Sequence, residues 1–137
     1  MRLICCALLM AVAFVTVVSS SASALAPFRK AFDDKYVKDS GDDAFKEAFK
    51  KEGCNTCHVK GKSDKKLRND YGMKLAELIP GNAKERLDQA ADKKAETAKL
   101  LEELDKAFEK AADEENEDGV KFGDLLKEHK LPGKQPE

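Results

Sequence analysis

Apolar side chains recur every three or four positions through most of the chain beyond residue 26, the spacing that places them on one face of an α-helix. Two short stretches come first, and each contains the pattern Phe-x-x-Ala-Phe, starting at Phe28 and at Phe45. Asp42 or Asp43 can cap the second of these helices, and Gly53 can end it. No stretch alternates apolar and polar residues as a half-buried strand does. The pattern therefore predicts an all-α fold.

Three more helices are expected in the second half of the chain. One runs from about Asp64 to Ile79, with an apolar stripe formed by Leu67, Tyr71, Leu75 and Leu78. The next is long and Ala-rich, begins near Asn82 and meets no Gly or Pro before Gly119. Its length, over residues 82–116, leaves open whether it is one helix or two. Its apolar face is formed by Leu87, Ala91, Ala98, Leu101, Leu104 and Phe108. A short last helix carries Phe122, Leu125 and Leu126.

The first 24 residues follow a different pattern. Residues 3–18 are apolar except for Thr16, and Ser- and Ala-rich sequence follows them. This apolar run of about 16 residues is shorter than the ~20 that a membrane-spanning helix needs, and its small-residue flank is typical of a secretory signal peptide. We expect cleavage after Ala24, with Ala26 as the alternative site and an uncleaved anchor as the alternative fate. Residues 25–137 then form one exported domain, periplasmic or otherwise extracytoplasmic, with no membrane span after cleavage.

Cleavage would remove Cys5 and Cys6 and leave Cys54 and Cys57 as the cysteines of the mature chain. Two cysteines close together in an exported domain exclude a wide disulfide framework. The remaining residues are enough for a single domain with a modest core.

Residues 54–58 read Cys-Asn-Thr-Cys-His, the spacing of a covalent haem attachment site. The two thiols can bond to the two vinyl groups along one edge of a haem, and His58 can bind the iron axially. One haem c per chain is therefore expected. Two alternatives are a thiol-disulfide oxidoreductase using both thiols, and zinc held by Cys54, Cys57, His58 and His129. The first normally accompanies a strand-helix-strand pattern, and the second lacks the usual ligand spacing.

With these residues the chain resembles a small monohaem c-type cytochrome, broadly of class I. The resemblance implies a small helical domain around one covalently attached haem, with Cys54 and Cys57 as the thioether cysteines and His58 as the proximal ligand. It also implies an extracytoplasmic electron carrier, not an enzyme, that accepts and donates single electrons. In that family the other iron ligand is commonly a Met in a loop before the last helix. This chain has an acidic segment there and no Met.

Two side chains are candidates for the distal iron ligand. Met73 is the only methionine beyond the signal peptide, and His129 is the only histidine besides His58. Helical geometry puts Met73 opposite the apolar stripe of its helix and His129 within the stripe of the last helix. A Met ligand raises the reduction potential, a second His lowers it, and an open position lets the iron take small ligands. The open position would make the protein a haem-based sensor or ligand-binding module.

Charge is nearly balanced overall, with 25 basic and 26 acidic residues, but it is unevenly distributed. The motif is followed by Lys60, Lys62, Lys65, Lys66 and Arg68, opposed locally by Asp64. Such a rim can steer a redox partner with an acidic surface, and an ordinary solvated loop has the same composition. Nucleic acid binding is not expected, because no basic stripe with interleaved aromatics is present. No nucleophile is paired with a base, and a monomer is expected.

Overall fold

The computed structural model describes residues 26–136, so the predicted signal peptide with Cys5 and Cys6 lies outside the described residues. The described chain is helical and contains no β-strand, apart from two isolated bridges between single residues. The prediction of an all-α fold is confirmed. Its elements are α1 (Ala26–Phe32), the π-helical turn η1 (Asp33–Val37), α2 (Asp43–Glu52), the 3₁₀ turn η2 (Gly53–Thr56), α3 (Asp70–Leu78), α4 (Ala83–Gln89), α5 (Lys93–Ala112) and α6 (Phe122–Lys127).

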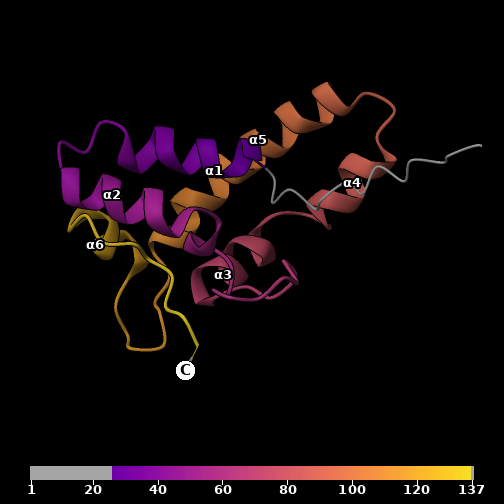
Figure 1. Cartoon of the computed structure of the whole chain (residues 1–137). Helices are drawn as coiled ribbons and strands as arrows, with labels where there is room; N and C mark the ends of the chain where they lie inside the picture. Colours follow the sequence, from indigo (N-terminus) through magenta and orange to yellow (C-terminus); the bar gives the residue numbers. More distant parts are fainter. Residues whose placement is uncertain (1–25, 137) are drawn as a thin grey trace, which may run out of the picture.

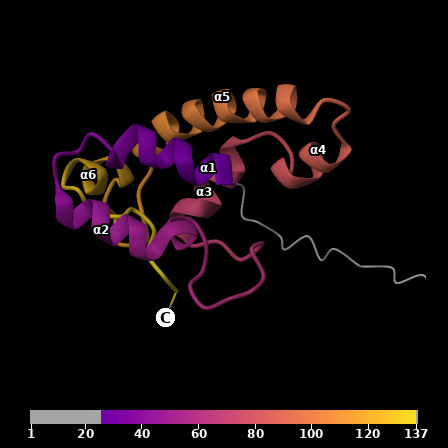
Figure 2. The ribbon, with the colours of Figure 1, turned by 45° about the horizontal axis from the view of Figure 1, so that its top comes forward.

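Helix α5 is the element on which the others are assembled, and α1, α3, α4 and α6 all contact it. Figures 1 and 2 show α4 beside one end of α5 and α6 near the other, with α1 running alongside. Helix α2 follows α1 through η1 and leads directly into η2, where the Cys-Asn-Thr-Cys-His motif of residues 54–58 begins. Among residues 26–136, no helix combines the length and apolar character needed to cross a membrane.

Four helices begin at a side chain that accepts a hydrogen bond from the backbone of their first turn. Asp42 caps α2 through the N–H of Phe45 at 2.9 Å, Asn82 caps α4 and Asp92 caps α5. Asn69 caps α3 through the N–H of Gly72 at 2.9 Å. The expected start of this helix near Asp64 is therefore wrong, because the cap lies five residues later. Residues 57–69 form a loop instead, in which Leu67 is 45% exposed.

The expected long helix over residues 82–116 is two helices. Ala90 is extended, and the Asp92 side chain accepts hydrogen bonds from the N–H groups of Lys94 and Ala95, which starts a new helix there. The Ala-rich helix is α5, and its buried face differs from the expected stripe: it is formed by Leu100, Leu104, Ala107, Phe108 and Ala111. Arg86 holds α4 against α5 by bonding to Glu96 at 2.7 Å and to Glu103 at 2.5 Å.

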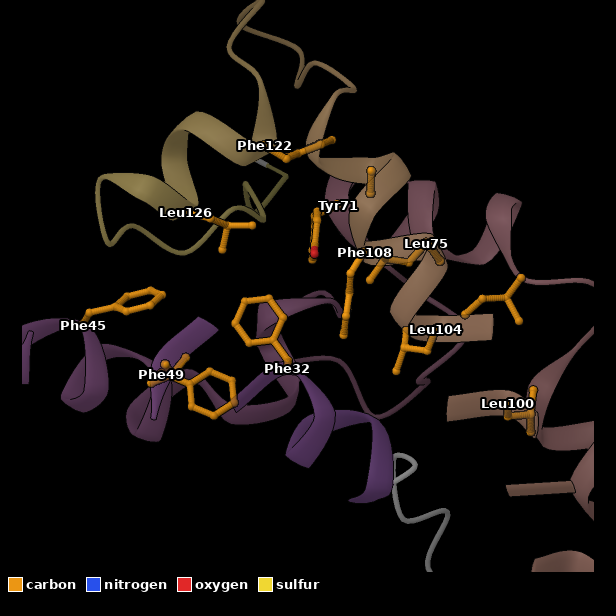
Figure 3. Close-up of a cluster of buried hydrophobic side chains, with 14 residues drawn as sticks. Phe32, Phe45, Phe49, Tyr71, Leu75, Leu100, Leu104, Phe108, Phe122 and Leu126 are labelled. Atoms are coloured by element: carbon orange, nitrogen blue, oxygen red, sulfur yellow. The ribbon is translucent and has the colours of Figure 1, made fainter. Parts of the chain in front are cut away.

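The core is an aromatic cluster to which α1, α2, α3, α5 and α6 all contribute (Figure 3). The ring of Phe32 lies at its centre, 5.4 Å from the ring of Phe49, 5.8 Å from that of Phe108 and 6.1 Å from that of Tyr71. Tyr71 in turn packs edge-on against Phe122 at 5.1 Å. Aromatic pairs at these separations stabilise a core beyond the area they bury. The cluster fixes the helices that surround the motif.

Candidate haem-binding site

The motif lies on a tight turn at the C-terminal end of α2. Gly53 ends α2 with φ of 53°, a left-handed conformation that glycine adopts without a Cβ penalty. The N–H groups of Cys57 and His58 then both donate to the carbonyl of Cys54, at 3.3 and 3.1 Å. This turn keeps the two thiols and the imidazole together on one short piece of backbone.

A cavity of about 530 Å³ lies beside the motif, and Cys54, Cys57 and His58 all line it. Its apolar wall comes from α1, α2, α3 and α5, with some of its residues far apart in the sequence: Phe28, Phe32, Phe49, Leu75, Ile79 and Leu104. Pockets for cofactors and other small molecules commonly have volumes of about 300–1,000 Å³ and are mostly apolar. The cavity therefore has the size and lining of a cofactor site.

The backbone of helix α3 is in close contact with the backbone of the motif. A Cβ atom built on Gly72 would stand 1.9 Å from the carbonyl oxygen of Cys57, which is closer than any side chain can approach. That same oxygen accepts a hydrogen bond from the N–H of Asn69 at 3.2 Å. The Asn69 side chain is buried and donates to the carbonyls of Asn55 and Thr56 at 3.1 and 3.0 Å. The start of α3 and the motif are thus joined by hydrogen bonds into one unit.

The C-terminal tail closes the other side of this loop. The Gln135 amide donates to the carbonyls of Asn55 and His58 at 2.9 and 3.1 Å, and its oxygen accepts from the N–H of Lys60 at 2.7 Å. Gly133 lies against Asn69, and Pro132 is fully buried. Sequence reasoning missed Gln135, because no local pattern marks a polar residue near a chain end as a partner of a distant loop. Gly72 and Asn69 carried weak signals, a glycine within a helical pattern and a capping residue before one.

The surroundings of the two central residues shift their pKa values. Burial raises the pKa of the Cys57 thiol to about 12, and the neighbouring Cys54 adds to this rise. A reactive redox thiol or a zinc-binding thiolate has the opposite property, a lowered pKa. Burial also lowers the pKa of His58, which favours the neutral imidazole that binds iron. The Nδ1 atom of His58 is buried and has no hydrogen-bond partner.

The mouth of the cavity is basic. Its polar lining includes Arg29, Lys65, Lys66, Arg68 and Lys84, against the acidic Asp64, Glu85 and Asp88. The guanidinium of Arg29 lies 5.5 Å from the centre of the Phe49 ring, which places a charge beside the apolar wall. This excess of cations suits a cofactor that carries carboxylates at one edge.

The two candidate distal ligands do not line the cavity. Met73 is 50% exposed on α3, on the side away from Gly72 and Leu75, as the helical spacing predicts. His129 lies just beyond α6, where its Nδ1 atom is 3.2 Å from the Asp42 carboxylate and its ring stacks on Phe45 with centres 5.7 Å apart. The structure brings Cys54, Cys57 and His58 together and leaves Met73 and His129 elsewhere.

The residues present fit a covalently bound haem. Two half-buried thiols and an imidazole at the attachment spacing line one largely apolar cavity of suitable volume. Zinc fits less well, since in residues 26–136 no three His, Cys, Asp or Glu side chains converge to hold a metal ion. His129, the fourth ligand in that alternative, is occupied at the opposite end of α2.

Comparison with known proteins finds no relative of this chain. The chain matches no protein-family model, no curated protein sequence and no solved structure.

Proposed function

We propose that this protein is an extracytoplasmic electron carrier with one covalently attached haem c. The observation that carries the proposal is the shared cavity: Cys54, Cys57 and His58 all line one apolar space of cofactor size. The bound haem would supply an iron that alternates between its ferrous and ferric states.

Each part of the site has a role in this proposal. Cys54 and Cys57 would form thioether bonds to the haem, and His58 would bind the iron. The phenyl groups of Phe28, Phe32 and Phe49 would exclude water from the haem ring. Burying the apolar haem against them would stabilise the fold through the hydrophobic effect. The cations at the mouth would pair with the haem carboxylates and present a basic face to a redox partner with an acidic surface.

The proposal is tested by expressing the whole chain, signal peptide included, in a periplasm that contains the haem maturation system. We expect an increase in mass by one haem that survives acid-acetone extraction, and a reversible one-electron wave in voltammetry. Cys54→Ala together with Cys57→Ala should abolish covalent attachment, while the matched pair Cys5→Ala and Cys6→Ala should not. A chain exported without covalent haem would overturn the proposal.

A haem-based ligand-binding module is the second candidate function. The observation in its favour is that Met73 and His129 both lie away from the cavity that holds the motif. A thiol-disulfide oxidoreductase has less support, because Cys57 has a raised pKa and residues 26–136 form no strand on which such an enzyme is built. The two haem functions differ in the second axial position of the iron.

A further inference from the structure

We infer that neither Met73 nor His129 binds the iron of the haem-loaded protein, and that the position opposite His58 takes a small neutral diatomic ligand from solution. This inference rests on the proposed haem attachment and is independent of electron transfer. Three features carry it: the face that α3 presents to the cavity, the contacts that hold His129, and the remaining side chains of the cavity wall.

Met73 lies on a face of α3 that does not line the cavity. The packing of α3 prevents the helix from rotating about its axis to bring Met73 to the cavity. Gly72, Leu75, Ala76 and Ile79 line the cavity, at the spacing of one helical face. Bringing Met73 to that face needs a rotation of about 100°. Such a rotation would move a full side chain toward the place of Gly72, where even a Cβ atom would stand 1.9 Å from the Cys57 oxygen. It would also expose Tyr71, whose exposed fraction is 0%.

His129 is held at the far end of α2 from the motif. Its ring contacts Asp42, the N-cap of α2, and Phe45 in the first turn of α2, whereas the motif follows the last turn. The eight residues from Phe45 to Gly53 span about 12 Å at 1.5 Å per residue. Its neighbours on both sides, Leu126 and Pro132, are buried, so the segment that carries His129 cannot swing across. Reaching the cavity would require α6 to leave the core.

The rest of the cavity wall offers no soft or imidazole ligand besides the motif itself. Its nitrogen-bearing side chains include the lysines 65, 66 and 84 and the arginines 29 and 68. An ammonium or guanidinium group has donors and no acceptor, so in its usual charged form it cannot bind iron. The rest of the lining is apolar, as at Phe32, Leu75 and Leu104, apart from polar side chains such as the carboxylates of Asp64, Glu85 and Asp88.

An apolar wall selects the kind of ligand. Burying an ion in such surroundings without a partner costs far more than burying a neutral molecule. A neutral diatomic molecule needs no hydrogen bond and donates a lone pair to ferrous iron, so it suits the apolar part of the wall formed by Phe32, Leu75 and Leu104. Carbon monoxide is the probe for this class, because it binds ferrous haem only where a coordination position is free or easily freed.

The test uses the haem-loaded full-length protein, after covalent haem has been measured. We expect the ferrous protein to have a five-coordinate, high-spin spectrum and to bind carbon monoxide stoichiometrically. Met73→Ala and His129→Ala should leave the spectrum unchanged and the carbon monoxide affinity within about twofold of the wild type, since neither side chain is at the iron.

A low-spin six-coordinate spectrum in the ferrous wild type would overturn the inference. Its loss in Met73→Ala or His129→Ala would identify that residue as the ligand, and its loss in Lys65→Ala, Lys66→Ala or Lys84→Ala would assign the position to a lysine amine. A five-coordinate iron that does not bind carbon monoxide would also overturn it, because the position would be blocked. Absence of covalent haem would instead refute the proposed function, and the haem content measured first separates the two failures.

Discussion

Gly72 of α3 lies directly against the carbonyl of Cys57, so that a Cβ on Gly72 would stand 1.9 Å from the oxygen and 2.8 Å from the carbon. Glycine is the only residue that permits this approach. The contact joins a helix of the core to the backbone of the motif, with no side chain between them. The orientation of His58, the next residue, therefore depends on where α3 lies.

The first prediction concerns this contact. Gly72→Ala should destabilise the protein by about 1–3 kcal/mol, because α3 or the motif must move to make room for the methyl group. Lys74→Ala on the same helix is the control, since its ion pairs are exposed and its effect should stay within about 0.5 kcal/mol. Denaturant unfolding of both variants measures the difference. Equal stabilities would mean that α3 does not press on the motif.

The second prediction separates the two roles of Asn69. Its oxygen caps α3, and its amide donates to the carbonyls of Asn55 and Thr56. Asn69→Asp keeps the cap and leaves both carbonyls without that donor, whereas Asn69→Ala loses both functions. We expect Asn69→Ala to cost about 2–4 kcal/mol from the lost cap and the unpaired carbonyls.

Asn69→Asp replaces the donor by a carboxylate that faces two carbonyl oxygens, so it should also lower the stability. Its yield of covalent haem should fall as well, because the attachment loop loses its anchor to α3. Circular dichroism would show α3 retained in this variant. A haem yield equal to that of the wild type would show that the loop keeps its shape without Asn69.

Sequence patterns predict a helix of this protein well where its capping residue or its apolar stripe lies within its own stretch of sequence. The Phe28 and Phe45 stretches, the cap by Asp42 and the start of α4 at Asn82 all lie where the pattern places them. No Gly or Pro marks the break between α4 and α5, so the sequence pattern leaves open whether this region is one helix or two. Asp92 makes that break as a capping side chain, but Asp88 four residues earlier lies within α4, so the residue type alone does not mark the break.

Residues 54–58 reveal the motif in the sequence, whereas no sequence pattern reveals the cavity. Its wall combines side chains from four helices, and only their packing brings Phe28 and Leu104 to the same space. The helical spacing correctly predicts that Met73 points away from the buried stripe of α3. The same spacing puts His129 with the stripe of the last helix, yet α6 ends at Lys127, and His129 turns with φ of 55° toward α2.

The third prediction tests the C-terminal tail. Gln135→Ala removes two hydrogen bonds to the carbonyls of Asn55 and His58 and one from the N–H of Lys60. At about 0.5–1.5 kcal/mol for each buried bond and less for exposed ones, we expect a loss of about 1–2 kcal/mol. Gln135→Glu is the matched control, since it keeps the acceptor for Lys60 and loses the two donors. Hydrogen exchange of the Lys60 amide should increase in Gln135→Ala and change little in Gln135→Glu. Identical exchange rates in both variants would contradict this role.

The fourth prediction concerns alkaline pH. Burial raises the pKa of Tyr36 from 10.0 to about 12, with smaller contributions from Asp105 and Glu109. The unfolded chain therefore loses this proton near pH 10 while the folded chain keeps it, so the free energy of unfolding should decrease as the pH rises from 10 to 12. Tyr36→Phe should reduce this slope without abolishing it, because burial also raises the pKa of Tyr71. A slope unchanged in Tyr36→Phe would show that the Tyr36 phenol titrates alike in both states.

The fifth prediction tests the basic mouth of the cavity through the rate of electron exchange. Ferricyanide is a small anionic oxidant, so a positive potential at an exposed haem edge should accelerate its reaction with the reduced protein. Reversing two charges, by Lys65→Glu with Lys66→Glu, should slow this reaction about tenfold at low ionic strength. The control is Lys127→Glu with Lys110→Glu, which makes the same change in net charge at residues that do not line the cavity. Because salt screens charges over about 10 Å at 0.1 M, the two double variants should converge as the salt concentration rises. Equal slowing at low salt would mean that net charge alone sets the rate, and that electrons do not leave the haem through the face formed by Lys65 and Lys66.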